Sequence, residues 1–180
     1  MPHNENTALW YPIRVTYSRE LKLKTYLDDA GIENFLPMHY ILGTGIHSGS
    51  KRLVPIIHNL IFAHATRKTL DNLKQTNMIT STMRYIMDRN TGLPMIIPED
   101  QMRNFIAIAG TNDEHLIYLP EEETALKAGD SVRITGGPFA GVEGELLRIK
   151  GDRRVVVKLA GFFTVATAFI HPSLLEKIDR

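Results

Sequence analysis

The residue types that carry out chemistry are present in this 180-residue chain, but they are not grouped as catalysis requires. His58 and His64 share one face of a predicted strand but stand far apart, and no carboxylate or third histidine lies at metal-ligand spacing. Serine, histidine and aspartate occur without a GxSxG frame. The glycines at 136–141 precede a strand and lack the P-loop pattern GxxxxGK[ST]. The sequence therefore predicts no metal, no cofactor and no enzymatic activity.

Basic side chains gather at two predicted turns. They are Lys51 and Arg52 at a loop tip in the first half, and Arg148, Lys150, Arg153 and Arg154 around a hairpin turn in the second half. Either group could contact nucleic acid or the ribosome, or could form an ordinary solvated turn. Because the net charge of the whole chain is only +1, tight non-specific binding to DNA is not expected.

Charge divides the chain into three parts. Residues 1–110 carry 12 Lys and Arg against 9 Asp and Glu, residues 111–127 carry 1 against 5, and residues 128–180 carry 8 against 6. An acidic, aperiodic stretch between two mildly basic ones is typical of a linker. We therefore predict an N-terminal domain at 1–110, an acidic linker at 111–127 and a C-terminal domain at 128–180.

Composition limits where such a protein can act. The absence of cysteine excludes disulfides, cysteine–zinc sites and thiol catalysis, and it suits a reducing cytoplasm. No run of about 18 apolar residues occurs, and no secretory leader is visible. We expect a cytoplasmic monomer that does not enter the membrane.

The first half mixes strand and helix patterns. Extended segments are expected at 10–16, 34–42, 83–87 and 94–97, and the apolar run 54–65 is expected to be one central strand. Helices are expected at 19–31, 69–77 and 98–110, the first with Ser18 as its N-cap and Gly31 at its C-terminal end. This order predicts an α+β domain with a mixed or antiparallel sheet. In the acidic stretch, residues 115–119 could add a strand or serve as an anchored linker.

Residues 129–147, GDSVRITGGPFAGVEGELL, hold the most specific pattern in the chain. Apolar and polar residues alternate up to Ile134, a Gly-rich bend follows, and a second strand begins at Val142. Such bends belong to small, strongly curved barrels, and the aromatic of the bend is expected to fill the interior. The stretch resembles a KOW motif, carried by Gly129, Asp130, Gly137, Pro138, Phe139, Gly141 and Gly144. About five short strands from here onward predict a small all-β SH3-like barrel.

Together, the α+β domain, the acidic linker and the KOW barrel resemble the NusG family of transcription elongation factors. The resemblance implies an N-terminal NGN-type α/β sandwich followed by the barrel. Trp10-Tyr11 before a strand and a helix is similar to the start of the NusG N-terminal domain, and Ile57-His58-Asn59-Leu60 stands where the family has Phe-Pro-Gly-Tyr. The run 56–66, IIHNLIFAHAT, is more similar to the UpxY branch, whose members are antiterminators for capsular polysaccharide operons in Bacteroides-type bacteria.

The resemblance implies a protein that binds RNA polymerase and suppresses pausing and termination without making or breaking a bond. Its N-terminal domain would sit on the clamp helices of the largest subunit and shift the enzyme from paused to elongating states. Carried over by position, the contact residues would be Arg14, Ile57, Leu60 and Phe62. Strand parity places Leu60 and Phe62 on one face, which could be core or contact surface.

Two alternatives stay open at this point. The first is a KOW-type protein that binds a ribosomal protein or nascent RNA through its barrel and acts without polymerase. The second is a general housekeeping NusG. The mixed charge and the large apolar strand of the first domain favour the polymerase-bound factor over a protein that binds RNA alone.

Overall fold

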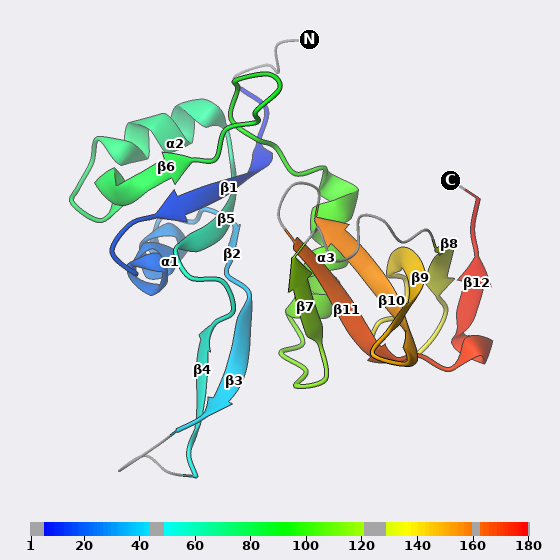
Figure 1. Cartoon of the computed structure of the whole chain (residues 1–180). Coiled ribbons are helices and arrows are strands. Elements are labelled where there is room, and N and C mark those ends of the chain that lie inside the picture. The colour runs from blue at the N-terminus through cyan, green and yellow to red at the C-terminus, as the bar shows by residue number, and fades with distance from the viewer. Residues whose placement is uncertain (1–5, 44–48, 121–128, 160–162, 180) are drawn as a thin grey trace. The chain divides into compact units, whose positions relative to one another are not determined.

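The computed structural model of the chain describes residues 6–43, 49–120, 129–159 and 163–179. The chain forms two compact units (Figure 1). The first comprises the residues up to Pro37 together with Pro55–Glu99, and the second comprises Met38–Val54 together with the residues from Asp100 onward. The expectation that 1–110 and 128–180 are separate domains, joined by a linker at 111–127, stays a prediction.

The first unit is built on a four-stranded antiparallel sheet with the strand order β2-β5-β1-β6. Its strands are β1 (Leu9–Val15), β2 (Asn34–Phe35), β5 (Leu60–Ala65) and β6 (Met83–Tyr85). β1 and β5 pair over most of their length, with Ile13 opposite Ile61. Side chains on both faces of β5 are buried from Leu60 to Ala63, so this strand forms the centre of the sheet.

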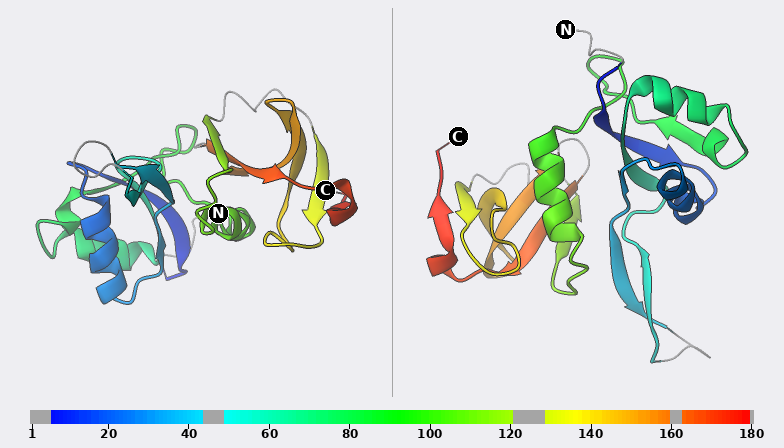
Figure 2. Two further views of the ribbon diagram at one scale, coloured as in Figure 1. Left: turned by 90° about the horizontal axis from the view of Figure 1, so that it is seen from below. Right: turned by 180° about the vertical axis from the view of Figure 1, so that it is seen from behind.

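Two helices, α1 (Glu20–Asp29) and α2 (Arg67–Lys74), lie on the same side of this sheet, and a short 3-10 helix, η2 (Thr80–Thr82), follows them (Figure 2). Leu23 and Leu27 are one helical turn apart in α1, and both are fully buried, as is Leu70 in α2. Apolar side chains repeated at this spacing form the stripe by which a helix packs on a core. The helices predicted from the apolar spacing of these segments are therefore confirmed.

The sequence predicted the C-terminal end of α1 correctly but not its N-cap. Gly31 takes a φ of +67° just after the helix and donates its N–H to the carbonyl of Asp28 at 3.0 Å, which confirms the predicted stop. The prediction of Ser18 as N-cap is wrong, because the helix begins at Glu20 and is preceded by Arg19. Ser18 has a φ of 48°, whereas an N-cap residue is extended, and its N–H is bound elsewhere.

The apolar run 54–65 is not one strand, contrary to the sequence prediction. Strand β4 (Lys51–Pro55) ends at Pro55, a turn occupies 56–59, and β5 starts at Leu60. The physical cause is Asn59, whose φ of 63° lies in the left-handed region and interrupts an extended chain. Apolarity alone did not reveal this break.

In the second unit, six antiparallel strands form one curved sheet with the order β12-β8-β9-β10-β11-β7. They are β7 (Ile117–Pro120), β8 (Asp130–Ile134), β9 (Glu143–Ile149), β10 (Asp152–Leu159), β11 (Phe163–Phe169) and β12 (Leu175–Lys177), the last preceded by the 3-10 helix η3 (Pro172–Leu174). Phe139 is only 3% exposed, as predicted for the aromatic of the bend. Gly144 permits the close approach of β9 to β10, because a Cβ there would lie 2.5 Å from the carbonyl oxygen of Val156. The predicted small all-β barrel is confirmed.

A helix and a two-stranded ribbon also belong to this unit, and one of its six strands comes from the expected linker. The helix α3 (Glu99–Ala109) lies beside the barrel, and Asn104 accepts the backbone N–H of Glu143 through Oδ1 at 3.2 Å. The run 115–119 contributes β7, which pairs with β11, so part of the expected linker is a strand of the sheet. The strands β3 (Met38–Leu42) and β4 form a two-stranded ribbon. The residues 121–128 of the expected linker lie outside the described residues.

Candidate functional site

Two turns that are distant in sequence meet on the first unit. One joins β1 to α1 at residues 16–19, and the other precedes β5 at residues 56–59. Of the five described non-glycine residues with positive φ, three lie here, namely Tyr17, Ser18 and Asn59, with φ values of 63°, 48° and 63°. Each such conformation costs on the order of 1–3 kcal/mol, and such strain clusters at functional sites. We call residues 16–19 and 56–59 the two-turn surface.

Asn59 holds the two turns together. Its side-chain Oδ1 accepts the N–H of Ser18 at 3.0 Å, and its backbone carbonyl accepts the N–H of Val15 at 2.9 Å. Asparagine tolerates the left-handed conformation better than most residues, because its short polar side chain can bond locally. The turn at 56–59 is therefore fixed by contacts with the segment between β1 and α1.

The exposed side chains of this surface are aromatic and basic. The side chain of Tyr17 is 81% exposed, and the guanidinium carbon of Arg19 lies 5.5 Å from the centre of its ring. Arg14 and His58 are also exposed, and Ile57 is half-buried. An exposed aromatic on a fixed turn, with cations at its margin, has the composition that protein interfaces favour.

A buried carboxylate lies beneath the exposed histidine. Glu20, in the first turn of α1, is only 3% exposed, and its Oε1 lies 3.7 Å from Nδ1 of His58. Its Oε2 is buried and has no hydrogen-bond partner among the described residues. The positive end of the helix favours a negative charge at this position. Glu20 thereby places an acidic group directly under the turn that carries His58.

The four predicted polymerase-contact residues separate into two pairs. Arg14 is exposed and lies opposite Leu60 in the sheet, and Ile57 belongs to the two-turn surface. Leu60 is 5% exposed and Phe62 is fully buried, and both lie on β5, an interior strand between β2 and β1. The expectation that their face of the strand could be open surface is therefore wrong in this structure.

Sequence reasoning missed the residues that shape this surface. Nothing in the pattern singled out Tyr17, and Glu20 read as an ordinary residue of an amphipathic helix. Asn59 was the readable signal, because it stands where the resembled family has a glycine. A glycine in a turn points to a positive φ, and Asn59 adopts one.

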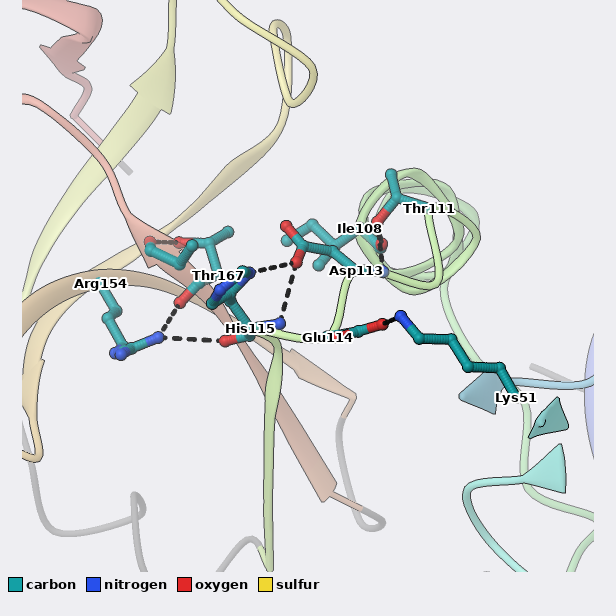
Figure 3. A network of polar contacts seen from close by, with 9 residues as sticks. Lys51, Ile108, Thr111, Asp113, Glu114, His115, Arg154 and Thr167 are labelled. Carbon is teal, nitrogen blue, oxygen red and sulfur yellow. Dashed lines mark hydrogen bonds and ion pairs between the residues drawn. The ribbon is translucent and has the colours of Figure 1, made fainter. Parts of the chain in front are cut away.

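The basic hairpin of the barrel contains two kinds of arginine. Arg148 and Arg153 are exposed and lie directly opposite each other on β9 and β10. The side chain of Arg154 is only 13% exposed, and it donates to the carbonyls of Thr167 at 2.8 Å and His115 at 3.2 Å (Figure 3). Arg154 therefore anchors the segment before β7 to the barrel, and its expected role as a nucleic-acid contact does not fit this position.

The same polar network reaches the ribbon. Lys51 and Arg52 are exposed on β4 rather than at a loop tip, so their predicted place is wrong. Lys51 forms an ion pair with Glu114, which raises the pKa of Lys51 and lowers the pKa of Glu114 (Figure 3). The adjacent Asp113 accepts the N–H of His115 at 2.9 Å, and this bond lowers the pKa of Asp113.

The structure gives each of the two histidines considered as metal ligands a single carboxylate. His58 lies near Glu20, and Nδ1 of His64 lies 2.7 Å from Oε2 of Glu33, with the His64 ring stacked on Trp10 at a centroid distance of 5.0 Å. Within the described residues, no group of three or more His, Cys, Asp or Glu side chains could hold a metal ion. Nor is any described helix long and apolar enough to cross a membrane.

Comparison with protein-family models decides the family. Residues 8–106 match the family described as "Transcription termination factor nusG", and residues 128–158 match the KOW motif. The first match alone spans more than half of the chain. The chain belongs to the NusG family. Its fold is that of an NGN domain followed by a KOW barrel, as the sequence predicted.

Other comparisons of this NusG-family chain add little. A solved structure titled "Domain interaction in Thermotoga maritima NusG" is 19% identical, with a TM-score of 0.47, and the match covers 98% of this chain and 100% of that one. A search of the curated proteins finds no match. NusG and KOW proteins are non-enzymatic transcription factors of elongation and termination, and the NusG family binds RNA polymerase.

Proposed function

We propose that this NusG-family chain binds RNA polymerase through the two-turn surface and suppresses pausing and termination. The observation that carries the proposal is the placement of Tyr17, an exposed aromatic on a turn that Asn59 fixes. A side chain presented on a fixed turn loses little conformational freedom when it binds, so more of its contact energy appears as affinity. Aromatic side chains and arginine are also the commonest residues to dominate binding energy.

The partner that we propose is the pair of clamp helices of the largest polymerase subunit. A helical hairpin presents a ridge of side chains, which a few protruding residues can engage. Arg14, Tyr17 and Ile57 would make the direct contacts. Leu60 and Phe62 would support them from within the sheet, because Leu60 directly follows the turn and Phe62 lies two residues further along β5.

We further propose that the chain is a specialised antiterminator of the UpxY type, acting in the cytoplasm on long operons such as capsular polysaccharide loci. The support is the segment Ile57-His58-Asn59-Leu60, which replaces the Phe-Pro-Gly-Tyr of the general family. Asn59 takes a left-handed conformation at the glycine position, which is compatible with a retained turn whose exposed Pro is replaced by His58 and whose Phe is replaced by the half-buried Ile57. A changed contact surface on a retained turn fits a specialised factor.

Binding to core RNA polymerase tests the contact surface. We expect Tyr17→Ala to weaken binding by at least about 10-fold, because a central aromatic anchor carries this much energy or more. Met78→Ala is the matched control, since Met78 is 78% exposed on the same unit and lies outside the two-turn surface. Both variants should retain the Trp10 fluorescence of the folded chain. If Tyr17→Ala binds as tightly as the unchanged chain, the polymerase contact lies elsewhere.

Transcription assays separate the alternatives for the function. Read-through should increase on a long, pause-rich capsular template and not on an unrelated template of equal length. An equal effect on both templates would indicate a housekeeping elongation factor. Binding to RNA or ribosomes with no effect on either template would favour the KOW-type protein that acts without polymerase.

A further inference from the structure

A second surface, on the barrel, carries three cations at the turn between β9 and β10. Arg148 of β9 lies opposite Arg153 of β10, and Lys150 stands in the turn itself. All three side chains are exposed. Lys150 and Gly151 have φ values of 51° and 90° and form a two-residue turn closed by the pairing of Ile149 with Asp152. Turns of this kind are compact, so the three cations are held close together.

The acidic side chains of the barrel are engaged by other cations. In the described part of the barrel, the ion pairs are Asp130–Lys177, Glu143–Arg133, Glu176–Arg133, Glu145–Lys158 and Asp152–Arg154. The remaining acid, Asp179, acts electrostatically on Lys177. Arg148, Lys150 and Arg153 form no ion pair with any described residue. The turn therefore concentrates positive charge that the described residues of the barrel leave uncompensated.

The placement of Arg148 against Arg153 opposes stability. Side chains directly opposite on neighbouring antiparallel strands have Cβ atoms about 4.5–5.5 Å apart, and like charges at this distance destabilise the pair. A chain that needed only solubility could separate these charges along the strands. An anion placed between the two guanidinium groups would turn the repulsion into two attractions.

The two arginines border an open hollow of about 650 Å³ that can receive such an anion. Its other lining residues are Gly129, Asp130, Leu146 and Leu147. Among the described lining residues, Asp130 is the one with a carboxylate, and its Oδ1 lies 2.8 Å from Nζ of Lys177. We propose that this hollow and the Lys150 turn bind the phosphate backbone of single-stranded nucleic acid.

The chemistry of the surface favours phosphates over bases and over carboxylates. Among the described residues, no aromatic side chain lines the hollow, so bases have no surface there on which to stack, and the sequence of the strand would not be read. Guanidinium forks match phosphate oxygens in two-point contacts, and two forks on adjacent strands can hold one phosphate. Lys150 stands in the turn, two residues beyond Arg148 and just past the end of β9, where it can contact a neighbouring phosphate.

Fluorescence anisotropy with a labelled 20-nucleotide oligouridylate and the full chain tests this site. With two phosphates neutralised, one by the arginine pair and one by Lys150, the logarithm of the association constant should fall with the logarithm of salt concentration with a slope of about −1.4. Arg148→Gln together with Arg153→Gln should reduce the slope to about −0.7 and weaken binding at low salt by at least about 10-fold. The melting temperature should be unchanged or higher, because the like-charge pair is removed.

The matched control is Arg89→Gln together with Arg103→Gln, which changes the net charge equally at two exposed positions that do not belong to this hairpin. We expect this control to retain the slope and the affinity. The assignment fails if the Arg148 and Arg153 variant binds RNA like the unchanged chain, or if its melting temperature falls, since the pair would then be structural. It also fails if an oligoglutamate of equal length competes as well as the RNA. A single-stranded DNA of the same length should bind within about threefold of the RNA, because the contacts are to phosphate.

Discussion

The turn at Ile56–Asn59 and the turn at Lys150-Gly151 both place a non-glycine residue in the left-handed region, but they are held in different ways. Asn59 is fixed from outside, by hydrogen bonds with Ser18 and Val15 of a distant segment. Lys150 is fixed from within, by the pairing of the two strands that its own turn connects. The first turn depends on tertiary structure and the second on local sequence.

This difference matters for what each turn can present. A turn that is fixed by another segment can keep an aromatic side chain such as Tyr17 exposed in one position, which suits a protein partner. A hairpin turn that is fixed by its own strands can carry cations such as Arg148 and Arg153 without partners, which suits a polyanion. The variants below test whether the two turns are as independent as their hydrogen bonds indicate.

The largest loss of stability should come from Gly144→Ala, which introduces a steric clash between β9 and β10, the two strands that the Lys150 turn connects. The new Cβ would lie 2.5 Å from the carbonyl oxygen of Val156, and a backbone atom cannot move aside as a flexible side chain can. We expect the free energy of unfolding of the barrel to fall by about 3 kcal/mol. Far-UV circular dichroism in urea should show an early transition.

Trp10 provides the control for this variant, because it is the single tryptophan of the chain and lies in the first unit. Its fluorescence transition should keep its midpoint in Gly144→Ala. A second control is Gly136→Ala, where the new Cβ would lie 3.1 Å from the end of the Leu174 side chain, which can adjust. Equal shifts of the Trp10 and circular dichroism transitions would show that the two regions unfold together.

We expect Asn59→Val to lower the free energy of unfolding of the first unit by about 2 kcal/mol. The urea transition of Trp10 fluorescence measures this change. A β-branched residue at a φ of 63° is strained, and the bond from the Ser18 N–H is lost. Two glycine variants test whether the side chains of Asn59 and Lys150 contribute differently to their turns. Asn59→Gly should still destabilise by about 0.5–1 kcal/mol, because the side-chain bond is removed. Lys150→Gly should be neutral or stabilising, since only strain is relieved. If the two glycine variants behave alike, the Asn59 side chain does not hold its turn.

The elements that depend on local pattern could be predicted from the sequence. The apolar spacing of Leu23 and Leu27 predicted α1, and the bend around Phe139 predicted the barrel. What could not be predicted depends on contacts between distant segments. The break at 56–59 and the failure of Ser18 as an N-cap both occur where a residue takes a positive φ, and the hydrogen bond that joins Ser18 to Asn59 links segments that are 41 residues apart in the sequence.

The candidate sites divide in the same way. Arg148 and Arg153 could be chosen from the hairpin pattern, because both flank a predicted turn. Arg154 differs from Arg153 by one position and so points to the opposite face of the strand. Its role depends on His115, a residue of the acidic segment whose docking on the barrel the sequence left open. Tyr17 became a candidate only when the structure showed how exposed it is.

Neighbouring arginines of β10 should therefore differ in their effect on stability. Arg154→Met should destabilise the barrel by about 1.5 kcal/mol, because the bonds from its guanidinium to the carbonyls of Thr167 and His115 are lost. Arg153→Met should change the stability by less than about 0.5 kcal/mol. Hydrogen exchange is a second measurement. The backbone amides of β7 should exchange faster in Arg154→Met than in the unchanged chain, and at an unchanged rate in Arg153→Met. Equal losses in both variants would contradict the separate roles assigned to the two arginines.

The smallest effect is the pH dependence of stability that Asp113 contributes in the segment before β7. The N–H of His115 donates to the Asp113 carboxylate and lowers the pKa of Asp113. Because the folded-state pKa lies below the unfolded one, the charge of Asp113 stabilises the fold above the ordinary carboxylate pKa of about 4. This contribution is lost as the pH falls through the lower, folded-state value. Asp113→Asn keeps an acceptor oxygen but removes the charge, so it should cost about 0.3 kcal/mol at pH 7, and the cost should shrink as the pH falls below about 4. Urea titrations of both chains across this range measure the difference, and a cost that is independent of pH would mean that the charge contributes nothing.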